Sequence, residues 1–372
     1  MKMTDRHLPR RFGDLPASGL SSPESVPLVV VGSPLVDLLV EVGPRFLQRF
    51  TPGTRGETAE LPRRAFERLL AQCGPGVRVC PGGSAANIAV GCGQLGIRTT
   101  LVGTCGADPW GERLRLHLRD RGCLPLLRVD RRHPTGRVLV LVTADGERTM
   151  RINLGASRHL HPAQLPARSL RPGVWVVIEG YLAHAGPLLH RLVERAKAAG
   201  CRVALDLGSP EVVRRCAPVL QGIKRQGIDL LFANRDEGRA WKAIAGRDVL
   251  ADWGQTGAVV CLKLGARGAL VAAGTRRIRL GTAPGAVTDT VGAGDAWAAG
   301  FLAGTVRGLA LATCADLAAR AAAAAVQVPG AEVPPELWRR LKIRLTRRAG
   351  QRAGGLWRSA VARPRTIAAH RP

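Results

Sequence analysis

The sequence has few aromatic residues, few lysines and no long apolar run. Phe, Trp and Tyr make up 4% of its 372 residues, and Tyr181 is the single tyrosine. Aromatic platforms on which single-stranded nucleic acid could stack are therefore scarce. A membrane-spanning helix needs ~20 consecutive apolar residues, and no run in the chain approaches that length. We therefore expect no membrane partner.

Cysteine and histidine are present but show no metal or disulfide pattern. The nine cysteines are scattered, no two are spaced as C-x-x-C, and several lie in apolar runs, as Cys261 does. This usage is typical of small buried residues in a reducing compartment, and we expect a cytoplasmic protein. His159 and His161 are the only close pair among eight histidines. With no third ligand nearby in sequence, we expect this pair to lie on the surface.

The net charge of +27 is almost entirely arginine, because only six of the 55 basic residues are lysine. One interpretation is a surface for nucleic acid or another polyanion. The other, which we favour for the body of the chain, is a genome that favours arginine together with attraction for a nucleotide substrate. Residues 331–372 hold eleven Lys and Arg against two Asp and Glu. For this basic C-terminal tail, nucleic-acid binding stays open.

The N-terminal 25 residues mix basic, acidic, proline and serine residues without an apolar core. That composition is typical of neither a signal peptide nor a transit peptide. It predicts a loose tail over residues 1–25.

One glycine motif organises the rest of the chain. Residues 289–295 read Asp-Thr-Val-Gly-Ala-Gly-Asp, and an alanine-rich apolar run follows over 296–302. We expect the β-branched run 286–291 to end a strand and the alanine-rich run to form a helix. The glycines then lie at a helix N-terminus, where free N–H groups and the macrodipole bind anions. Asp295 beside such a site suggests phosphoryl transfer to a hydroxyl, with Asp295 as the base and its pKa lowered by the dipole.

The fold class predicted is α/β, with a doubly wound, mostly parallel sheet flanked by helices. Short apolar runs alternate with helical patterns, and this alternation is typical of parallel sheets. Strands are expected at 26–32, 99–103, 175–179, 203–206, 230–233 and 259–263. Residues 136–153 instead predict a β-hairpin with an Asp-Gly turn. With the irregular stretch 38–60 this hairpin predicts a small β lid, which is also a possible homodimer surface.

Two further features lie where parallel strands should end. Asp37 follows Gly32 by five residues, and ligands bind at the carboxyl ends of such strands. A turn or helix-capping role for Asp37 is equally compatible with its position. Gly82-Gly83 and Asn87 form a second strand–glycine–helix junction, whose alternative is a tight turn with a surface asparagine.

Two common nucleotide motifs are excluded. Residues 91–96 match G-x-G-x-x-G, but they lie at the end of a helix and before a strand, the reverse of the dinucleotide-binding order. Gly96 is therefore interpreted as a helix C-cap. A Walker A loop is excluded because no Gly-Lys dipeptide occurs in the chain.

The two glycine junctions resemble the signatures of the ribokinase-like carbohydrate kinases, also called the PfkB family. The first signature runs from Gly82-Gly83 through Asn87, Ala89 and Gly96 to Gly106, and the second covers 289–302. The likeness extends over about 26–331. The resemblance implies a ribokinase-like kinase domain over these residues and leaves 1–25 and 332–372 outside it.

The resemblance also implies roles for individual residues. Gly292, Ala293 and Gly294 would form the anion hole, with Asp295 as catalytic base. Acceptor hydroxyls would be bound by Asp37, Gly82, Gly83 and Asn87.

For the nucleotide, the implied residues are Asn234, Glu237, Lys263, Gly265, Gly268 and Gly330. Glu237 would support Mg²⁺ through water, and Asp289 would help to bind a monovalent cation such as K⁺. Lys263 stands where some family members carry a threonine.

The predicted activity is an ATP- and Mg²⁺-dependent kinase acting on a hydroxymethyl group of a sugar or nucleoside. Residues 32–37 and 135–153 look most like the adenosine-kinase-like branch. A fructokinase- or ribokinase-type sugar kinase is the alternative. A catalytically idle relative that binds nucleic acid through its basic tail is a further hypothesis, and an NAD-dependent dehydrogenase is disfavoured by the misplaced glycine motif.

Overall fold

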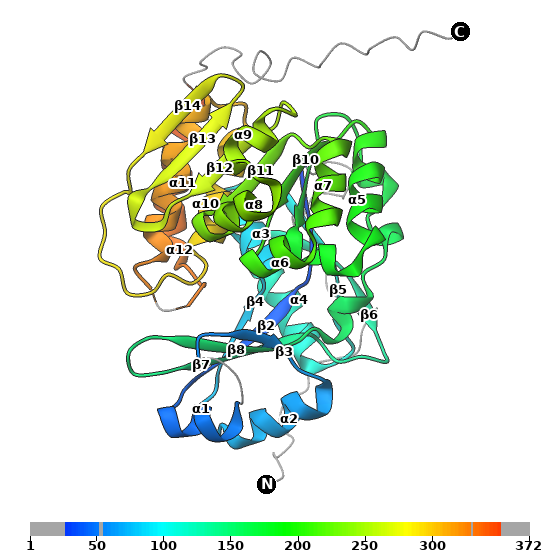
Figure 1. Ribbon diagram of the computed structural model, residues 1–372, viewed down its shortest axis with the longest axis vertical. Coiled ribbons are helices and arrows are strands. Elements are labelled where there is room, and N and C mark those ends of the chain that lie inside the picture. The colour runs from blue at the N-terminus through cyan, green and yellow to red at the C-terminus, as the bar shows by residue number, and fades with distance from the viewer. Residues whose placement is uncertain (1–26, 52–54, 329, 351–372) are drawn as a thin grey trace.

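The larger sheet is built from nine strands and is mostly parallel. A computed structural model describes residues 27–51, 55–328 and 330–350 of the chain (Figure 1). The strands of this sheet are, in order across it, β14 (Arg276–Leu280), β13 (Ala269–Ala273), β12 (Val259–Lys263), β11 (Leu230–Asn234), β10 (Arg202–Asp206), β9 (Trp175–Glu179), β1 (Leu28–Val31), β5 (Thr99–Gly106) and β6 (Cys123–Asp130). Every neighbouring pair from β12 to β6 is parallel, and only β13 and β14 run antiparallel to their neighbours.

Helices cover both faces of this sheet, which explains its continuous apolar strands. Leu28 and Val30 of β1 face one core, while Val29 and Val31 face the other. The first core is covered by α3 (Ser84–Gln94), α4 (Pro109–Asp120), α10 (Ala293–Val306), α11 (Leu311–Ala325) and α12 (Pro335–Gly350). The second is covered by α5 (Pro187–Ala198), α6 (Pro210–Arg215), α7 (Ala217–Gln226), α8 (Arg235–Ala245) and α9 (Val249–Gly254). The predicted fold class is confirmed.

A second sheet forms the smaller lobe, seen below the body in Figure 1. Its five strands follow the order β3 (Thr58–Glu60), β8 (Arg148–Asn153), β7 (Arg137–Val142), β2 (Leu35–Glu41) and β4 (Arg78–Gly82). Helices α1 (Pro44–Phe50) and α2 (Arg63–Gln72) pack on its outer face (Figure 1). The β7–β8 hairpin and its turn at Gly146 are as predicted. This lid begins at Leu35 and includes β4, so it is larger than the predicted segments 38–60 and 136–153.

Two expectations about secondary structure and domain boundaries are wrong. Residues 286–291 form no strand; they lie in an irregular loop in which Thr288 and Asp289 donate backbone hydrogen bonds to Val326 O. The chain beyond 331 is also not simply a tail. Trp338 and Leu345 of α12 are 3% and 0% exposed and join the core. Their spacing of seven residues places them on one helix face. The sequence prediction of a tail had instead relied on the arginines that lie between them.

Within the described part of the chain, the connections include five short 3₁₀ turns: η2 (Gly155–His159), η3 (Pro162–Gln164), η4 (Ala167–Ser169), η5 (Gly180–Ala185) and η6 (Gly265–Arg267). All nine cysteines are free thiols, and seven of them are buried.

Among the described residues, no helix has the length and apolar character needed to cross a membrane. Residues 1–25 and the end of the basic tail, about which predictions were made, lie outside the described part of the chain.

Candidate active site

The N-terminus of α10 lies near the lid, because Asp289, three residues before Gly292, pairs with Arg148 of the lid. Its first residues follow Gly292, which has a left-handed backbone with φ of +70°. A Cβ added there would lie 2.7 Å from Cβ of Ala331, so both conformation and space require glycine. Gly294 leaves the first helical turn without side-chain cover. The resulting backbone has the form of an anion site at a helix N-terminus.

Asp295, in the first turn of α10, is held by the first turn of α3. Its carboxylate accepts hydrogen bonds from Ser84 Oγ at 2.8 Å and from Asn87 Nδ2 at 2.9 Å. The two glycine junctions, whose hydrogen-bonded residues are 208 and 211 positions apart in sequence, therefore meet at one carboxylate.

Burial raises the pKa of Asp295 to about 6, and the charge of Asp206 adds to this, while Asn87, Ser84 and Lys263 act in the opposite direction. The prediction of a lowered pKa is wrong, because desolvation of the carboxylate outweighs the helix dipole. A carboxylate that titrates near 6 is also the better base at neutral pH.

Asp37 lies on the inner face of the lid, on β2. Its backbone is paired with Cys80 of β4, and a Cβ on the neighbouring Gly82 would lie 2.4 Å from Asp37 Oδ2. Burial raises the pKa of Asp37 to about 7, and the charge of Asp295 raises it further, while Arg148 opposes the shift. The charge of Asp295 affects the pKa of Asp37, so the carboxylate on the lid and the one on the body lie near one another.

Gly83 sits where the chain passes from β4 of the lid to α3 of the body. Its φ is +90°, and a Cβ there would lie 2.6 Å from Ser33 O. Ser33 is itself at the crossing from β1 to β2, and its N–H donates to Oε1 of buried Glu179 at 2.6 Å. The glycine is thus required by close contact between two crossing segments.

The Asn234–Glu237 motif forms a capping box at the start of α8. Asn234 Oδ1 accepts from the backbone N–H of Glu237 at 2.9 Å, and Glu237 Oε2 accepts from Asn234 N at 2.7 Å. Unlike the solvated cap considered from sequence, Glu237 is only 1% exposed. Burial, followed by the charge of Asp206, raises the pKa of Glu237 to about 7.

Lys263 ends β12, directly beside Asn234 in the neighbouring strand. Its Nζ lies 3.0 Å from Oδ2 of Asp206, which ends β10 and is 5% exposed. Burial lowers the pKa of Lys263, but the charges of Asp206 and Glu237 outweigh burial and raise it above its usual value. Asp206 was not predicted, although an acid at the carboxyl end of a parallel strand was the available signal.

Gly265 and Gly268 shape the turn between β12 and β13. Both have positive φ, and a Cβ on Gly268 would lie 1.9 Å from Leu280 O. This turn places them beside Lys263, at the carboxyl end of β12.

Asp289 and Gly330 meet beside the anion site. The Asp289 carboxylate accepts from Val291 N at 2.9 Å and from Gly330 N at 2.6 Å, and it pairs with Arg148 of the lid. Desolvation acts to raise the pKa of Asp289, but these hydrogen bonds and Arg148 outweigh it and lower that pKa. Arg148 was not predicted. Its Nη1 is buried and has no hydrogen-bond partner among the described residues.

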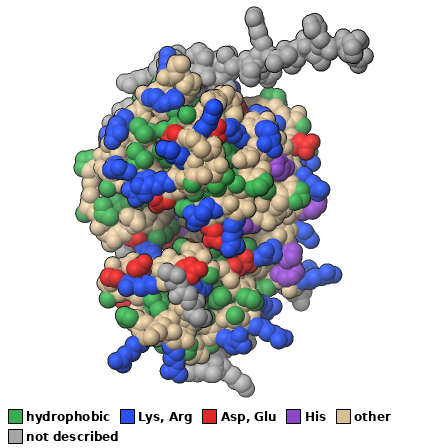
Figure 2. All heavy atoms as spheres, viewed as in Figure 1, with side chains coloured by type: hydrophobic (Ala, Val, Ile, Leu, Met, Phe, Trp, Pro, Cys, Tyr) green, Lys and Arg blue, Asp and Glu red, His purple; other side chains and the backbone are tan. Residues whose placement is uncertain are grey.

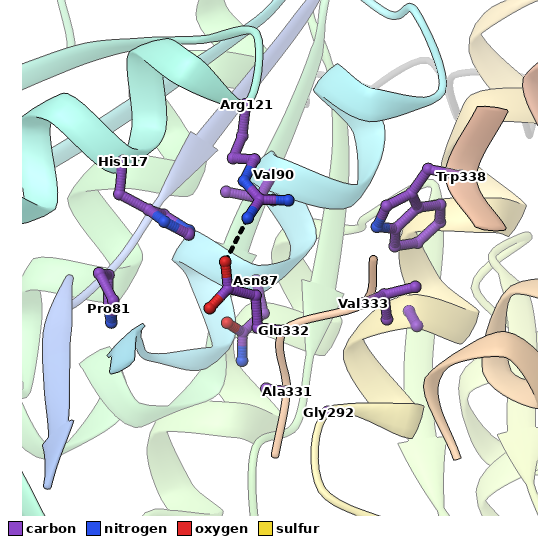
Figure 3. Close-up of a pocket in the computed structure, with 11 residues that line it drawn as sticks. Pro81, Asn87, Val90, His117, Arg121, Gly292, Ala331, Glu332, Val333 and Trp338 are labelled. Carbon is purple, nitrogen blue, oxygen red and sulfur yellow. Dashed lines mark hydrogen bonds and ion pairs between the residues drawn. The ribbon is translucent and has the colours of Figure 1, made fainter. Parts of the chain in front are cut away.

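A small pocket lies beside Asn87, and Pro81 of the lid strand β4 is among the residues that line it (Figure 3). Gly292 and Ala331 line it from the anion-site loops, and Trp338 of α12 lines its far side. Figure 3 shows Arg121 pairing with Glu332 across this pocket. Because α12 lines this pocket together with the first turns of α3 and α10, it supports the region that holds Asp295.

A two-lobed α/β structure, with a glycine-flanked helix N-terminus on the body and a buried carboxylate on a β lid, has the architecture of a small-molecule kinase of the ribokinase-like fold. The family model of the pfkB family carbohydrate kinases matches residues 68–338. The chain belongs to this family, whose members are phosphotransferases that use an alcohol group as acceptor.

Individual relatives agree with this assignment. A ribokinase of Arabidopsis thaliana is 29% identical over 82% of this chain and 77% of its own length. An adenosine kinase of Schizophyllum commune is 25% identical over 86% of this chain and 99% of its own. The crystal structure of adenosine kinase from Sinorhizobium meliloti superposes with a TM-score of 0.78 at 28% identity, covering 86% of this chain and 99% of that one.

Proposed function

We propose that the protein transfers the γ-phosphate of ATP to a hydroxymethyl group of a nucleoside, with adenosine-like acceptors favoured. The observation that carries this proposal is the meeting of Asp295, the α10 anion site and the lid carboxylate Asp37 in one place. A base and a phosphate-binding backbone on the body, opposite a hydroxyl-binding acid on the lid, are the parts that phosphoryl transfer to an alcohol requires.

In this mechanism Asp37 and the Gly82-Gly83 backbone orient the acceptor through its hydroxyls. Asp295, fixed by Ser84 and Asn87, accepts the proton of the attacking hydroxyl. The backbone of Gly292, Ala293 and Gly294 stabilises charge on the transferring oxygens, and losing one such donor typically costs ~10²–10³ in turnover.

The hydrogen-bond donors near the N-terminus of α10 suit the phosphates of a nucleotide. A Cβ on Gly294 would lie 3.5 Å from Lys263 Nζ, so this ammonium faces the anion site. We assign Lys263 to the phosphates, Gly265 and Gly268 to the adjoining turn, and Gly330 to the loop near the adenine. The unpartnered Nη1 of Arg148, whose other terminal nitrogen pairs with Asp289, is a further donor near this region.

The family implies two cations, Mg²⁺ and K⁺, and only Mg²⁺ fits the residues present. Glu237 lies beside Asp206 in a buried acidic group, and with Asn234 it would hold hydrated Mg²⁺, which neutralises phosphate charge when bound. The Asp289 carboxylate does not fit as a K⁺ ligand in this structure. Its oxygens already accept from two N–H groups and a guanidinium, and we derive no step from K⁺.

The inner face of the lid favours a nucleoside over a free sugar. Leu39, Val138 and Val140 are buried in one cluster, with Met150 and Ile152 packed against it, on the same face as Asp37. A flat base would cover the apolar surface that the partly buried Met150 and Ile152 leave exposed, whereas a small sugar would leave hydroxyls facing it unpaired, at about 1–3 kcal/mol for each buried one. Similarity to adenosine kinases supports the same choice.

The test is ADP release measured with adenosine, other nucleosides, ribose, fructose and their phosphates as acceptors. We expect adenosine or a close analogue to give the highest kcat/KM. A higher value with ribose or fructose would instead favour the sugar-kinase alternative. No turnover on any acceptor, together with RNA or DNA affinity that falls steeply with salt, would identify an idle relative that binds nucleic acid.

A further inference from the structure

The structure brings together three metal-ligating side chains that are separated in sequence. Asp130 ends β6, His133 follows in the next loop, and His159 ends η2. One ligand atom from each lies within 4.8 Å of the other two. Figure 2 shows histidine side chains at the right-hand edge of the molecule, beside the boundary between the two lobes. The sequence showed only His159 and His161 as neighbours and gave no third ligand.

The cluster is organised before any ion binds. Asp130 Oδ1 accepts from the backbone N–H of Arg132 at 2.7 Å and of His133 at 3.1 Å, which fixes the carboxylate. Asp130 Oδ2 lies 3.0 Å from Nδ1 of His133. Two atoms that ligate one tetrahedral ion lie roughly 3.3 Å apart, so Asp130 Oδ2 and His133 Nδ1 are already close to the spacing of two ligands of one ion.

His159 stacks on His133 with ring centroids 4.0 Å apart and planes at 25°. Two imidazoles bound to one tetrahedral ion have nitrogens roughly 3.3 Å apart, given metal–nitrogen bonds of about 2.0–2.1 Å. In the stacked arrangement the nitrogens of the two rings point in similar directions, so the rings must rotate relative to one another before both can face the same ion. His133 is 43% exposed, so such rotations meet little packing resistance.

The backbone beneath the cluster is tightly packed. Ala156 N donates to Pro134 O at 2.7 Å, and a Cβ on Gly155 would lie 2.2 Å from that oxygen. Thr135 N donates to Oδ2 of Asp108 at 2.8 Å. His133 and His159 are therefore carried by two segments in fixed contact, which are the segments that enter β7 and leave β8.

We propose that Asp130, His133 and His159 bind a divalent transition ion that clamps the base of the β7–β8 lid hairpin. Two imidazoles and one carboxylate suit Zn²⁺, Co²⁺ or Ni²⁺ and not Mg²⁺. The ion would join the entry and the exit of the hairpin and restrict its movement relative to the body. Of the nearby arginines, Arg158 pairs with Glu60, whereas Arg131 and Arg132 are exposed and will weaken the affinity. The site does not depend on the proposed kinase activity.

The experiment is a Co²⁺ titration of the chelator-treated full chain, followed by visible absorption and by competition with Zn²⁺. We expect one equivalent to bind, and His133→Asn and His159→Asn each to weaken binding at least tenfold. His190→Asn, which changes an imidazole on α5 outside the cluster, should leave the affinity unchanged. No saturable Co²⁺ binding, or equal affinity in all four proteins, would overturn the site.

Hydrogen–deuterium exchange tests the clamp separately. Zn²⁺ should slow exchange over residues 137–153 in the unchanged chain and leave it unchanged in His159→Asn. Zn²⁺ binding without slower exchange in the unchanged chain would overturn the clamp.

Discussion

Asp295 shows that position on a helix does not by itself set a pKa. A helix N-terminus stabilises a carboxylate by about 0.3–1 kcal/mol at an exposed site, whereas full burial can raise a carboxyl pKa by as much as 3–5 units. Sequence reveals the helix start but not how deeply it is covered by the opposite lobe. The pKa of about 6 therefore emerged only once α3 and the lid were in place.

The same groups predict how activity depends on pH. In the proposed mechanism both Asp37 and Asp295 act in the ionised form, so kcat/KM should fall in two steps as the pH drops, through about 7 and then about 6. Asn87→Ala removes a hydrogen bond that lowers the pKa of Asp295. In the Asn87→Ala variant, the step due to Asp295 should therefore move to higher pH. A profile of kcat/KM from pH 5 to 9 measures this shift. An unshifted lower step in Asn87→Ala would contradict this account of the carboxylate.

The residues of the candidate site differed in how far they could be predicted from the sequence. Asp295 and the two glycine pairs stand in compact motifs, and they could be predicted with their neighbours. Asp206 and Arg148 stand in no motif, and their importance comes from what the fold places beside them, Lys263 and Asp289 respectively. Contacts between residues more than 50 positions apart are not encoded in any local pattern.

At the scale of elements, buried strands were the most predictable feature. β9, β10, β11 and β12 are continuous apolar runs because helices cover both faces of the sheet. β6 was not predicted; it contains Pro125, which is tolerated because β6 is an edge strand. Helices α6 and α7 were also missed, since each is short and has proline in its first turn, which resembles a loop.

Helix α12 should stabilise the kinase domain although it lies beyond the predicted boundary. Trp338→Ala removes a side chain that is 3% exposed and packs beside Gly91. We expect it to lower the free energy of unfolding by about 3–5 kcal/mol, measured by urea denaturation.

Ile343→Ala on the same helix provides the control. Ile343 is 50% exposed, so its loss should change the free energy of unfolding by no more than about 0.5 kcal/mol. Equal effects of the two substitutions would show that α12 does not contribute to the core.

At the scale of the whole molecule, the lid and the body share one site. Arg148 of the lid pairs with Asp289 of the body, and the charge of Asp295 in the body raises the pKa of Asp37 in the lid. A closing lid excludes water and completes a catalytic group from both lobes. The excess of arginine over the surface is compatible with attraction for a polyanionic nucleotide.

Arg148→Met tests this connection between the lobes. It removes the pairing with Asp289 and the unpartnered Nη1, and we expect kcat/KM to fall by roughly 10²–10³, measured by ADP release. Arg158→Met is the matched control, because Arg158 lies on the lid side, is 54% exposed and pairs with Glu60. A comparable loss in both variants would mean that the effect arises from lid stability and not from the site.

The most direct test of the proposed function is Asp295→Asn, assayed for phosphoryl transfer and for ATP binding in parallel. Asp120→Asn, at an exposed position at the end of α4, is the control. With Asp295 as the base, turnover should fall by about 10²–10⁴, while ATP affinity stays close to that of the unchanged chain. Turnover in Asp295→Asn equal to that of the unchanged chain would remove Asp295 from the mechanism.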